Sequence, residues 1–172
     1  QTKRVHTTFN QAIVSTGRLS SNKPNFQNIP IKTDIGKKIR RAFIPQSENH
    51  YIYSFDYSQI ELRILTHFTN ESELLKAFNN EEDIHLRTAS LVFGVSEDEV
   101  DFQKRQIAKT INYSILYGAG PFRISQELKI PIKDASEIIK NYFNSYPQIK
   151  NYIDSTVKFG EKHGFVKTLN GQ

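Results

Sequence analysis

The chain has 172 residues, a formal net charge of +5 and neither cysteine nor methionine. The lack of cysteine excludes a disulfide framework and a thiolate metal site. No apolar run approaches the length that crosses a bilayer, so we expect a soluble protein without a membrane partner. The positive charge fits a polyanionic partner and, equally, an ordinary lysine-rich surface. Because position 1 is not methionine, we expect a piece of a longer protein.

Residues 1–30 mix short strand-like pieces with glycine, serine, asparagine and proline, a composition typical of loops. Arg18, Asn25 and Gln27 stand out in this segment as side-chain donors. They can satisfy backbone groups within the loop, as polar loop residues commonly do. They can also donate to the acceptors that a nucleic-acid duplex exposes in its minor groove. The sequence leaves both interpretations open.

A basic stretch follows, in which apolar residues recur at helical spacing through residues 33–43. We expect a helical turn here that leads into a strand. Such a cationic run is usually a solvated surface, but beside a bound nucleic acid it would neutralise phosphates. The cations of this stretch are Lys32, Lys37, Lys38, Arg40 and Arg41.

Residues 51–65 combine a predicted strand, an acidic residue and a predicted helix. Residues 51–55 are rich in aromatic and β-branched side chains, which favour a strand, and the apolar residues from Ile60 onward favour a short buried helix. Asp56 lies at the junction. It is placed to bind a hard cation such as Mg²⁺, which prefers oxygen ligands. The alternative is that Asp56 or Ser58 simply caps the helix.

Two short amphipathic helices are predicted next, one from Ser72 and one from Ile84, which Gly94 ends. His85 falls in the first turn of the second helix, just after Asp83. A single histidine at such a place is more often a surface or cap residue than a functional one. The acidic run at 96–99 is typical of a solvated helix start, where negative charge meets the positive end of the helix dipole.

The helix predicted over residues 104–118 has two chemically distinct faces. One face is apolar, and the other carries a stripe of two cations and two tyrosines spanning roughly 12 Å from the first cation to the first ring. A nucleoside triphosphate fits such a stripe, with phosphates on the cations and the base or sugar against the ring. An ordinary amphipathic helix with two exposed cations is the alternative. The stripe consists of Arg105, Lys109, Tyr113 and Tyr117, and the apolar face of Ile107, Ala108, Ile111 and Ile115.

Gly118, Gly120 and Pro121 are expected to end this helix. Three amphipathic packing helices should follow, over residues 124–128, 135–146 and 149–159, with prolines between them. Residues 165–169 read as a strand, and Asn170 with Gly171 as a hairpin turn.

These motifs, in this order and spacing, resemble the polymerase core of family A DNA polymerases, the bacterial DNA polymerase I type. Residues 56–63, DYSQIELR, are similar to the family's first catalytic motif, and the stripe that ends at Tyr117-Gly118 matches its nucleotide-binding helix. Residues 16–21 and 24–30 are similar to the segment that contacts primer and template. The resemblance covers essentially the whole chain.

The resemblance implies an α+β fold: a partial palm with a short antiparallel sheet over residues 1–63, and a mostly helical fingers subdomain over residues 64–172. It implies a DNA-templated DNA polymerase of replication and repair, acting as a monomer in the bacterial cytoplasm at the nucleoid; an organellar or phage origin is the alternative. The partners would be primer and template DNA and deoxynucleoside triphosphates, and the cofactor two Mg²⁺ ions. A nucleic-acid-binding module that keeps the fold without catalysis is the alternative.

Site residues follow from the resemblance position by position. Asp56 would bind both metal ions, helped by the backbone carbonyl of Tyr57, and Lys109 would donate a proton to pyrophosphate. Glu61 would exclude a ribose 2′-hydroxyl. The nucleotide-binding residues would be Gln59, Glu61, His85, Arg105, Lys109, Tyr113 and Tyr117. The DNA-binding residues would be Arg18, Asn25, Gln27 and Arg63.

Two features depart from the family's full pattern. The ring position of the nucleotide helix is commonly Phe in bacterial relatives, and Tyr113 occupies it here, as in some phage relatives; this implies ready acceptance of dideoxynucleotides. The family's second catalytic carboxylate lies in a His-Asp-Glu motif, and no His-Asp pair occurs in these 172 residues. Because two-metal transfer needs both carboxylates, we expect the isolated chain not to extend a primer.

Overall fold

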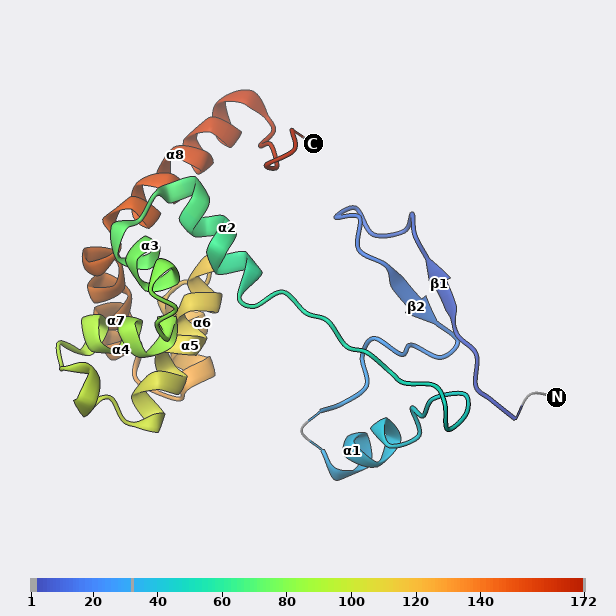
Figure 1. Cartoon of the computed structure of the whole chain (residues 1–172). Helices are drawn as coiled ribbons and strands as arrows, with labels where there is room; N and C mark the ends of the chain where they lie inside the picture. The colour runs from blue at the N-terminus through green and yellow to red at the C-terminus, as the bar shows by residue number, and fades with distance from the viewer. Residues whose placement is uncertain (1–2, 32, 172) are drawn as a thin grey trace. The chain divides into compact units, whose positions relative to one another are not determined.

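The computed structural model describes residues 3–31 and 33–171. Packing divides the chain into an N-terminal unit, Gln1–Asp56, and a helical unit, Tyr57–Gln172 (Figure 1). Among the described residues, no helix is long and apolar enough to span a membrane.

The N-terminal unit contains a two-stranded antiparallel sheet and one short helix. Strand β1 (Thr8–Asn10) pairs with β2 (Ser20–Asn22), with Phe9 opposite Ser21. Helix α1 (Asp34–Arg40) begins where the Thr33 hydroxyl accepts a hydrogen bond from the Gly36 amide. The strand-like pieces and the helical turn of the basic stretch are therefore confirmed, although Lys32 lies outside the described residues.

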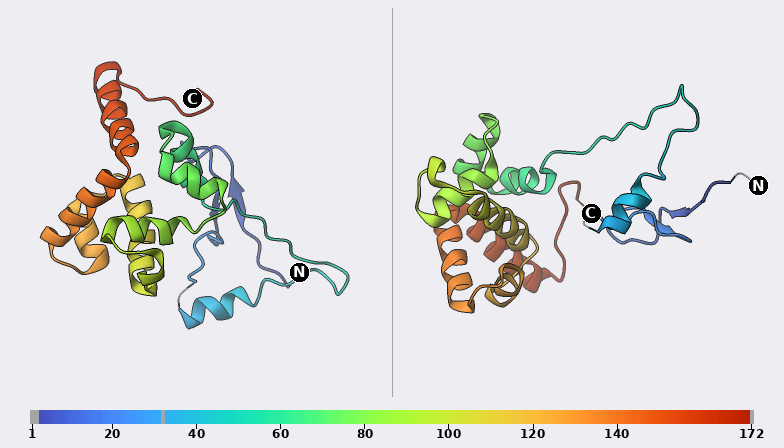
Figure 2. Two further views of the ribbon diagram at one scale, coloured as in Figure 1. Left: turned by 60° about the vertical axis from the view of Figure 1, so that its left-hand side comes forward. Right: turned by 90° about the horizontal axis from the view of Figure 1, so that it is seen from below.

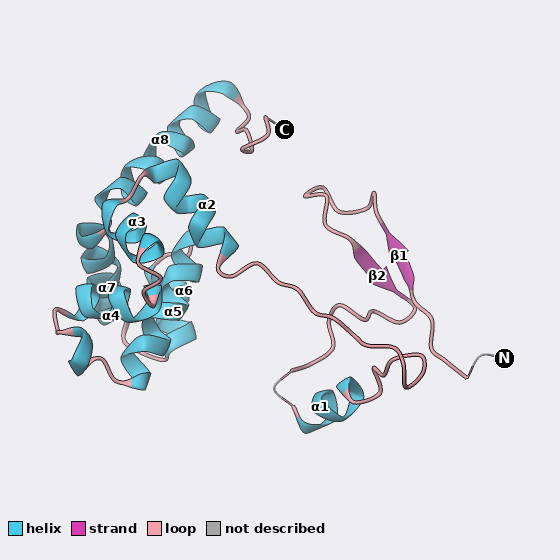
Figure 3. Cartoon of the chain, viewed as in Figure 1, coloured by secondary structure: helices cyan, strands magenta, loops and turns pink. Residues whose placement is uncertain are grey.

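Two strands expected in this unit are wrong. Residues 42 and 43 and residues 51–55 lie in loops, which Figure 3 colours pink. The rings of Tyr51, Tyr53 and Phe55 do follow one another at strand-like spacing, with centroids 6.4 and 6.3 Å apart. A strand also needs a ladder partner, and the described segments provide none for this one. Phe55 is 90% exposed as a result.

The helical unit carries every helix expected from the periodicity. Figures 1 and 2 show its helices gathered into one body. The bounds are α2 (Ile60–Thr69), α3 (Ser72–Asn79), α4 (Ile84–Phe93), the 3₁₀ turn η1 (Glu97–Glu99), α5 (Phe102–Leu116), α6 (Pro121–Leu128), α7 (Ile132–Ser145) and α8 (Pro147–His163).

The predicted helix ends are mostly confirmed. Gly94 ends α4 with a left-handed φ of 65°, which glycine adopts without a Cβ clash. Gly118 follows α5 with a φ of 74°, and Pro121 opens α6. The strand expected over residues 165–169 is wrong, because this segment forms no ladder with any described residue.

The core of the helical unit lies around α4 and α5. Helix α4 packs against α3, α5 and α7, and α5 packs against α2, α4 and α6. The predicted apolar face of α5 is confirmed, with Ala108, Ile111 and Ile115 buried and Ile107 partly buried. One small antiparallel sheet and a mostly helical remainder confirm the α+β class.

Candidate active site

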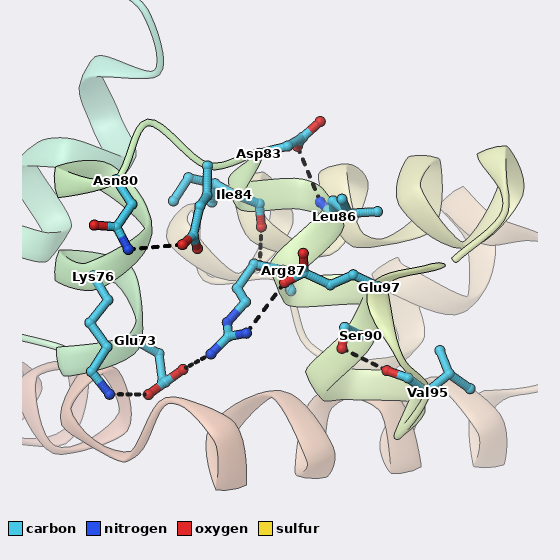
Figure 4. Close-up of polar contacts among 12 residues, drawn as sticks. Glu73, Lys76, Asn80, Asp83, Ile84, Leu86, Arg87, Ser90, Val95 and Glu97 are labelled. Carbon is cyan, nitrogen blue, oxygen red and sulfur yellow. Dashed lines mark hydrogen bonds and ion pairs between the residues drawn. The ribbon is translucent and has the colours of Figure 1, made fainter. Parts of the chain in front are cut away.

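Asp83 joins the start of α4 to the start of α5. One carboxylate oxygen, Oδ1, accepts hydrogen bonds from the backbone amides of His85 and Leu86 at 2.9 and 3.1 Å, and so caps α4 (Figure 4). The other oxygen, Oδ2, accepts from Arg105 Nε at 2.7 Å. Partial burial alone would raise the pKa of Asp83, but the bonds from Arg105 and the two amides outweigh it and hold the pKa below its ordinary value.

Helix α4 is also fixed from its other side. Arg87 donates to Glu73 of α3 at 2.6 Å and to Glu97 of η1 at 3.3 Å, and Lys76 donates to Glu73 at 3.1 Å (Figure 4). The bonds from Arg87 and Lys76 lower the pKa of Glu73. These bonds fix the position of α4, and therefore of the His85 backbone.

His85 is neither a surface residue nor a cap, contrary to the commoner expectation for such a histidine. It is 3% exposed, and its Nδ1 lies 3.1 Å from Nδ2 of Asn112 on α5. Burial lowers the pKa of the imidazole; Asp83 opposes the shift, and the charges of Arg105 and Lys109 add to it. The ring is therefore neutral near pH 7.

A neutral buried histidine makes stability depend on pH. Because the folded pKa of His85 lies below its ordinary value of 6.5, the unfolded chain binds more protons as pH falls through that range. We expect the free energy of unfolding to decrease below about pH 6.5, by at most about 1.4 kcal/mol per pH unit from this group. Denaturant titrations between pH 7.5 and 5 measure the slope.

The control for this prediction is a pair of glutamine variants. His85→Gln should remove that component of the slope, since glutamine does not titrate. His163→Gln, which changes an exposed histidine at the end of α8, should keep it. An unchanged slope in His85→Gln would contradict the assignment.

The predicted stripe of α5 is present. Arg105 is about one-third exposed, Lys109 is exposed, Tyr113 is partly buried and Tyr117 is 61% exposed. The ring of Tyr113 lies 5.9 Å from the imidazole of His85, centre to centre. Lys109 makes no hydrogen bond or ion pair within the described ranges. One free ammonium, one partly engaged guanidinium and a ring therefore line one face of the helix beside a neutral histidine.

The N-terminus of α2 is not capped by either of the residues considered for that role. The N-cap residue is Gln59, in a left-handed conformation and without a side-chain cap, so neither Asp56 nor Ser58 caps the helix. Instead, Arg63 Nε donates to the Ser58 carbonyl at 3.0 Å, and its guanidinium lies 4.4 Å from the centre of the Phe78 ring. Glu61 is partly buried in the first turn.

Asp56 is the last residue of the N-terminal unit, and its side chain is exposed. Tyr57, the first residue of the helical unit, is 79% exposed. A carboxylate and a backbone carbonyl are the hard oxygen donors that Mg²⁺ accepts. No group of three or more acidic or histidine residues suited to a metal occurs in the described part of the chain.

The loop donors of the N-terminal unit make bonds within the loop. Asn25 Oδ1 accepts from the Gln27 amide at 2.9 Å, and Gln27 Nε2 donates to the Leu19 carbonyl at 3.0 Å. The within-loop interpretation is confirmed for these two side chains. Arg18 lies exposed in the segment before β2, whereas Asn25 and Gln27 follow β2.

The model of DNA polymerase family A matches residues 1–172. The chain belongs to this family. It is 47% identical over its whole length to the thermostable DNA polymerase I of Thermus aquaticus, and 48% identical over 168 residues to DNA polymerase I of Bacillus caldotenax. It covers 21% and 19% of those proteins, so it spans about a fifth of their length.

A solved structure agrees with this family membership. The POL domain of Pol1 from M. smegmatis, in complex with DNA primer-template and dNTP, matches 99% of this chain with a TM-score of 0.86 and 40% identity. The chain covers 30% of that protein.

Within this family A chain, the structure brings His85, Arg105, Lys109 and Tyr113 together on α4 and α5. Asp56 and the loop donors belong to the N-terminal unit. Sequence reasoning missed two members, Asp83 and Asn112. Asp83 stands at a cap position before His85, a signal that suggests capping but not the bond to Arg105. Asn112 sits next to the apolar face of α5 and gives no signal of its own.

Proposed function

We propose that this chain is part of a DNA-templated DNA polymerase, which adds deoxynucleotides to a primer 3′ end by two-metal phosphoryl transfer in replication and repair. The observation that carries the proposal is the cluster on α4 and α5. A free lysine, an arginine held by one edge and a neutral histidine lie along one face, next to an aromatic ring. Cations and neutral donors in line suit a triphosphate, and the ring suits a base or sugar.

Each residue takes a role that its position supports. The Nε edge of Arg105 is engaged by Asp83, which leaves its terminal amino groups to hold phosphate oxygens. Lys109 and His85 hold further phosphate oxygens. Gln59, the N-cap residue of α2, also contacts the phosphates. Lys109 also donates a proton to the leaving pyrophosphate. Tyr113 and Tyr117 contact the nucleoside, and Glu61 excludes a 2′-hydroxyl.

Asp56 and the carbonyl of Tyr57 would hold the two Mg²⁺ ions together with donors from outside the described cluster. When bound, Mg²⁺ activates the primer hydroxyl and neutralises charge on the leaving group. Asp56 supplies the negative charge that attracts the ions, and its exposed carboxylate is open to them.

Primer and template DNA would be contacted by Arg18, Asn25, Gln27 and Arg63. Asn25 uses its oxygen and Gln27 one proton of its amino group, so the Asn25 amino group and the second Nε2 proton of Gln27 are left to donate to a duplex. Residues 1–63 would then act as a partial palm and residues 64–172 as fingers. The protein would act as a monomer in the bacterial cytoplasm at the nucleoid.

Binding measurements on the chain test this function. A fluorescent primer and template duplex is titrated with the chain, with and without Mg²⁺ and the nucleotide that pairs with the template. We expect the correct nucleotide to tighten binding and a mismatched one not to. Arg105→Ala should abolish the tightening, whereas Arg123→Ala, on an α6 arginine paired with Glu127, should keep it. Binding without nucleotide dependence would favour the non-catalytic module.

Tyr113 gives a further prediction for a polymerase that carries this chain. Tyr113→Phe removes only the hydroxyl, which is proposed to substitute for the 3′-hydroxyl missing from a dideoxynucleotide. We expect discrimination against dideoxynucleotides to rise by about tenfold or more, the value of one good hydrogen bond to a charged system. The ratio of kcat/KM for the two nucleotides measures it. Tyr152→Phe, on α8, is the matched control, and equal ratios in wild type and Tyr113→Phe would contradict the role.

A further inference from the structure

A chain of buried hydrogen bonds lies beneath the candidate site. Thr88, Asn112 and Tyr146 have no exposed surface, yet each side chain carries polar atoms. Thr88 Oγ1 lies 2.9 Å from Tyr146 Oη and 3.1 Å from Asn112 Nδ2, and the same Nδ2 lies 3.1 Å from Nδ1 of His85. This series of hydrogen bonds therefore runs from Tyr146 at the end of α7, through α4 and α5, to His85.

The direction of each bond follows from what each atom can donate. Thr88 Oγ1 lies 2.8 Å from the carbonyl oxygen of Ile84 and 3.4 Å from Asn112 Oδ1. Both oxygens can only accept, and the much shorter contact takes the single hydroxyl proton of Thr88. Burial raises the pKa of Tyr146 to about 12, so its hydroxyl keeps its proton and donates to Thr88. Thr88 Oγ1 is thus an acceptor toward both Tyr146 and Asn112.

This fixes the amide of Asn112. Its nitrogen, Nδ2, lies 3.1 Å from both Thr88 Oγ1 and His85 Nδ1, while its oxygen lies 3.4 Å from Thr88 Oγ1. One proton of Nδ2 goes to Thr88 Oγ1, which accepts, and the second points to His85 Nδ1. Because the NH₂ group cannot accept, Nδ1 of His85 must be the acceptor, and the proton of the neutral ring is on Nε2.

The remaining nitrogen of the His85 ring is Nε2. Nε2 makes no hydrogen bond with any described residue, and it is not among the fully buried unpartnered atoms of the described chain, where Tyr142 Oη stands alone. An N–H group at this position attracts a phosphate oxygen, whereas the lone pair of the other tautomer would repel it.

We propose that Asn112 is a positioning residue, which holds His85 in its Nε2–H form so that the ring donates a hydrogen bond to a phosphate oxygen of the incoming nucleoside triphosphate. The proposal rests on the function proposed above, because that function supplies the triphosphate. The tautomer of His85, by contrast, is a property of the ligand-free protein and does not depend on the proposed function. The two parts are therefore measured separately.

The first measurement is the tautomer, read from the imidazole ¹⁵N chemical shifts of the 172-residue chain labelled at histidine, at pH 8 and without nucleotide. We expect Nε2 to be protonated and Nδ1 not. In Asn112→Asp the side chain becomes an acceptor of nearly the same size, and the proton should move to Nδ1. Asn141→Asp, which alters a partly buried asparagine that donates to the Val92 carbonyl, should leave the His85 signals unchanged.

The wild-type spectrum decides even where the Asn112 variant does not fold. A proton on Nδ1, or an average of both tautomers, would overturn the positioning role. Tyr146→Phe removes the far end of the chain of bonds and leaves the Asn112–His85 contact, so it should keep the Nε2–H form. If Tyr146→Phe lost the Nε2–H form, the tautomer would depend on the whole hydrogen-bond network and not on Asn112 alone. That result would overturn the proposal.

The second measurement is binding of the correct deoxynucleoside triphosphate to the chain with primer and template. Asn112→Asp should weaken this binding about tenfold. Added to His85→Ala, it should cause no further loss, because its effect passes through the ring. A full additional loss in the double variant would overturn the proposal. If the wild-type chain binds no triphosphate, the proposed function fails, while the tautomer result stands or falls by itself.

Discussion

Lys109→Ala should lower kcat for nucleotide addition by about 10²- to 10⁴-fold in a polymerase that carries this chain, the usual contribution of a positioned proton donor. The ammonium is exposed on α5, one turn after Arg105, and no described residue engages it. A lysine with no hydrogen-bond or ion-pair partner among the described residues is available to a group of the substrate. Single-turnover extension of a primer by one nucleotide gives the rate.

Two further variants separate charge from proton transfer. Lys109→Arg keeps a cation at the same place but cannot give up a proton at neutral pH, so it should keep much of the triphosphate affinity and lose most of the rate. Lys140→Ala, on an exposed lysine of α7, should change neither. If Lys109→Arg restored the wild-type rate, Lys109 would act through its charge alone.

Helix α5 illustrates what a sequence can predict here. Its buried face, its stripe and, to within two residues, its bounds follow from a period of 3.6 residues, because a helix makes its own backbone hydrogen bonds and needs no partner segment. Asn112 was not predicted. Its role depends on His85, 27 residues earlier, and on Tyr146, 34 residues later, and periodicity carries no information about which residues of other helices meet it.

The strands predicted over residues 51–55 and 165–169 are wrong because a strand, unlike a helix, depends on a partner segment. Residues 51–55 and 165–169 have the composition of strands, and the rings of Tyr51, Tyr53 and Phe55 even follow one another at strand spacing. A strand exists only where a second segment completes its ladder, and composition does not specify that segment. The same limit applies to Asp56, whose expected support on one side was the missing strand.

Asp56→Asn should lower kcat in the same polymerase by more than about a hundredfold. Loss of a residue that merely supports a metal ligand typically costs 10- to 100-fold, and Asp56 is proposed to be a ligand itself. Asparagine keeps the size and one oxygen but removes the charge that attracts a divalent cation. The Mg²⁺ concentration that gives half of the maximal rate should therefore rise as well. Extension rates measured over a series of Mg²⁺ concentrations give both quantities.

The alternative roles of Asp56 predict different results. The structure already excludes a capping role for Asp56, since the N-cap residue of α2 is Gln59 and no described side chain makes a capping hydrogen bond there. A general loss of negative charge is tested by Asp98→Asn, on an exposed aspartate of η1, which should leave kcat and the Mg²⁺ requirement unchanged. If Asp56→Asn kept the wild-type Mg²⁺ requirement and lost only rate, Asp56 would act on the substrate directly and the metal role would be wrong.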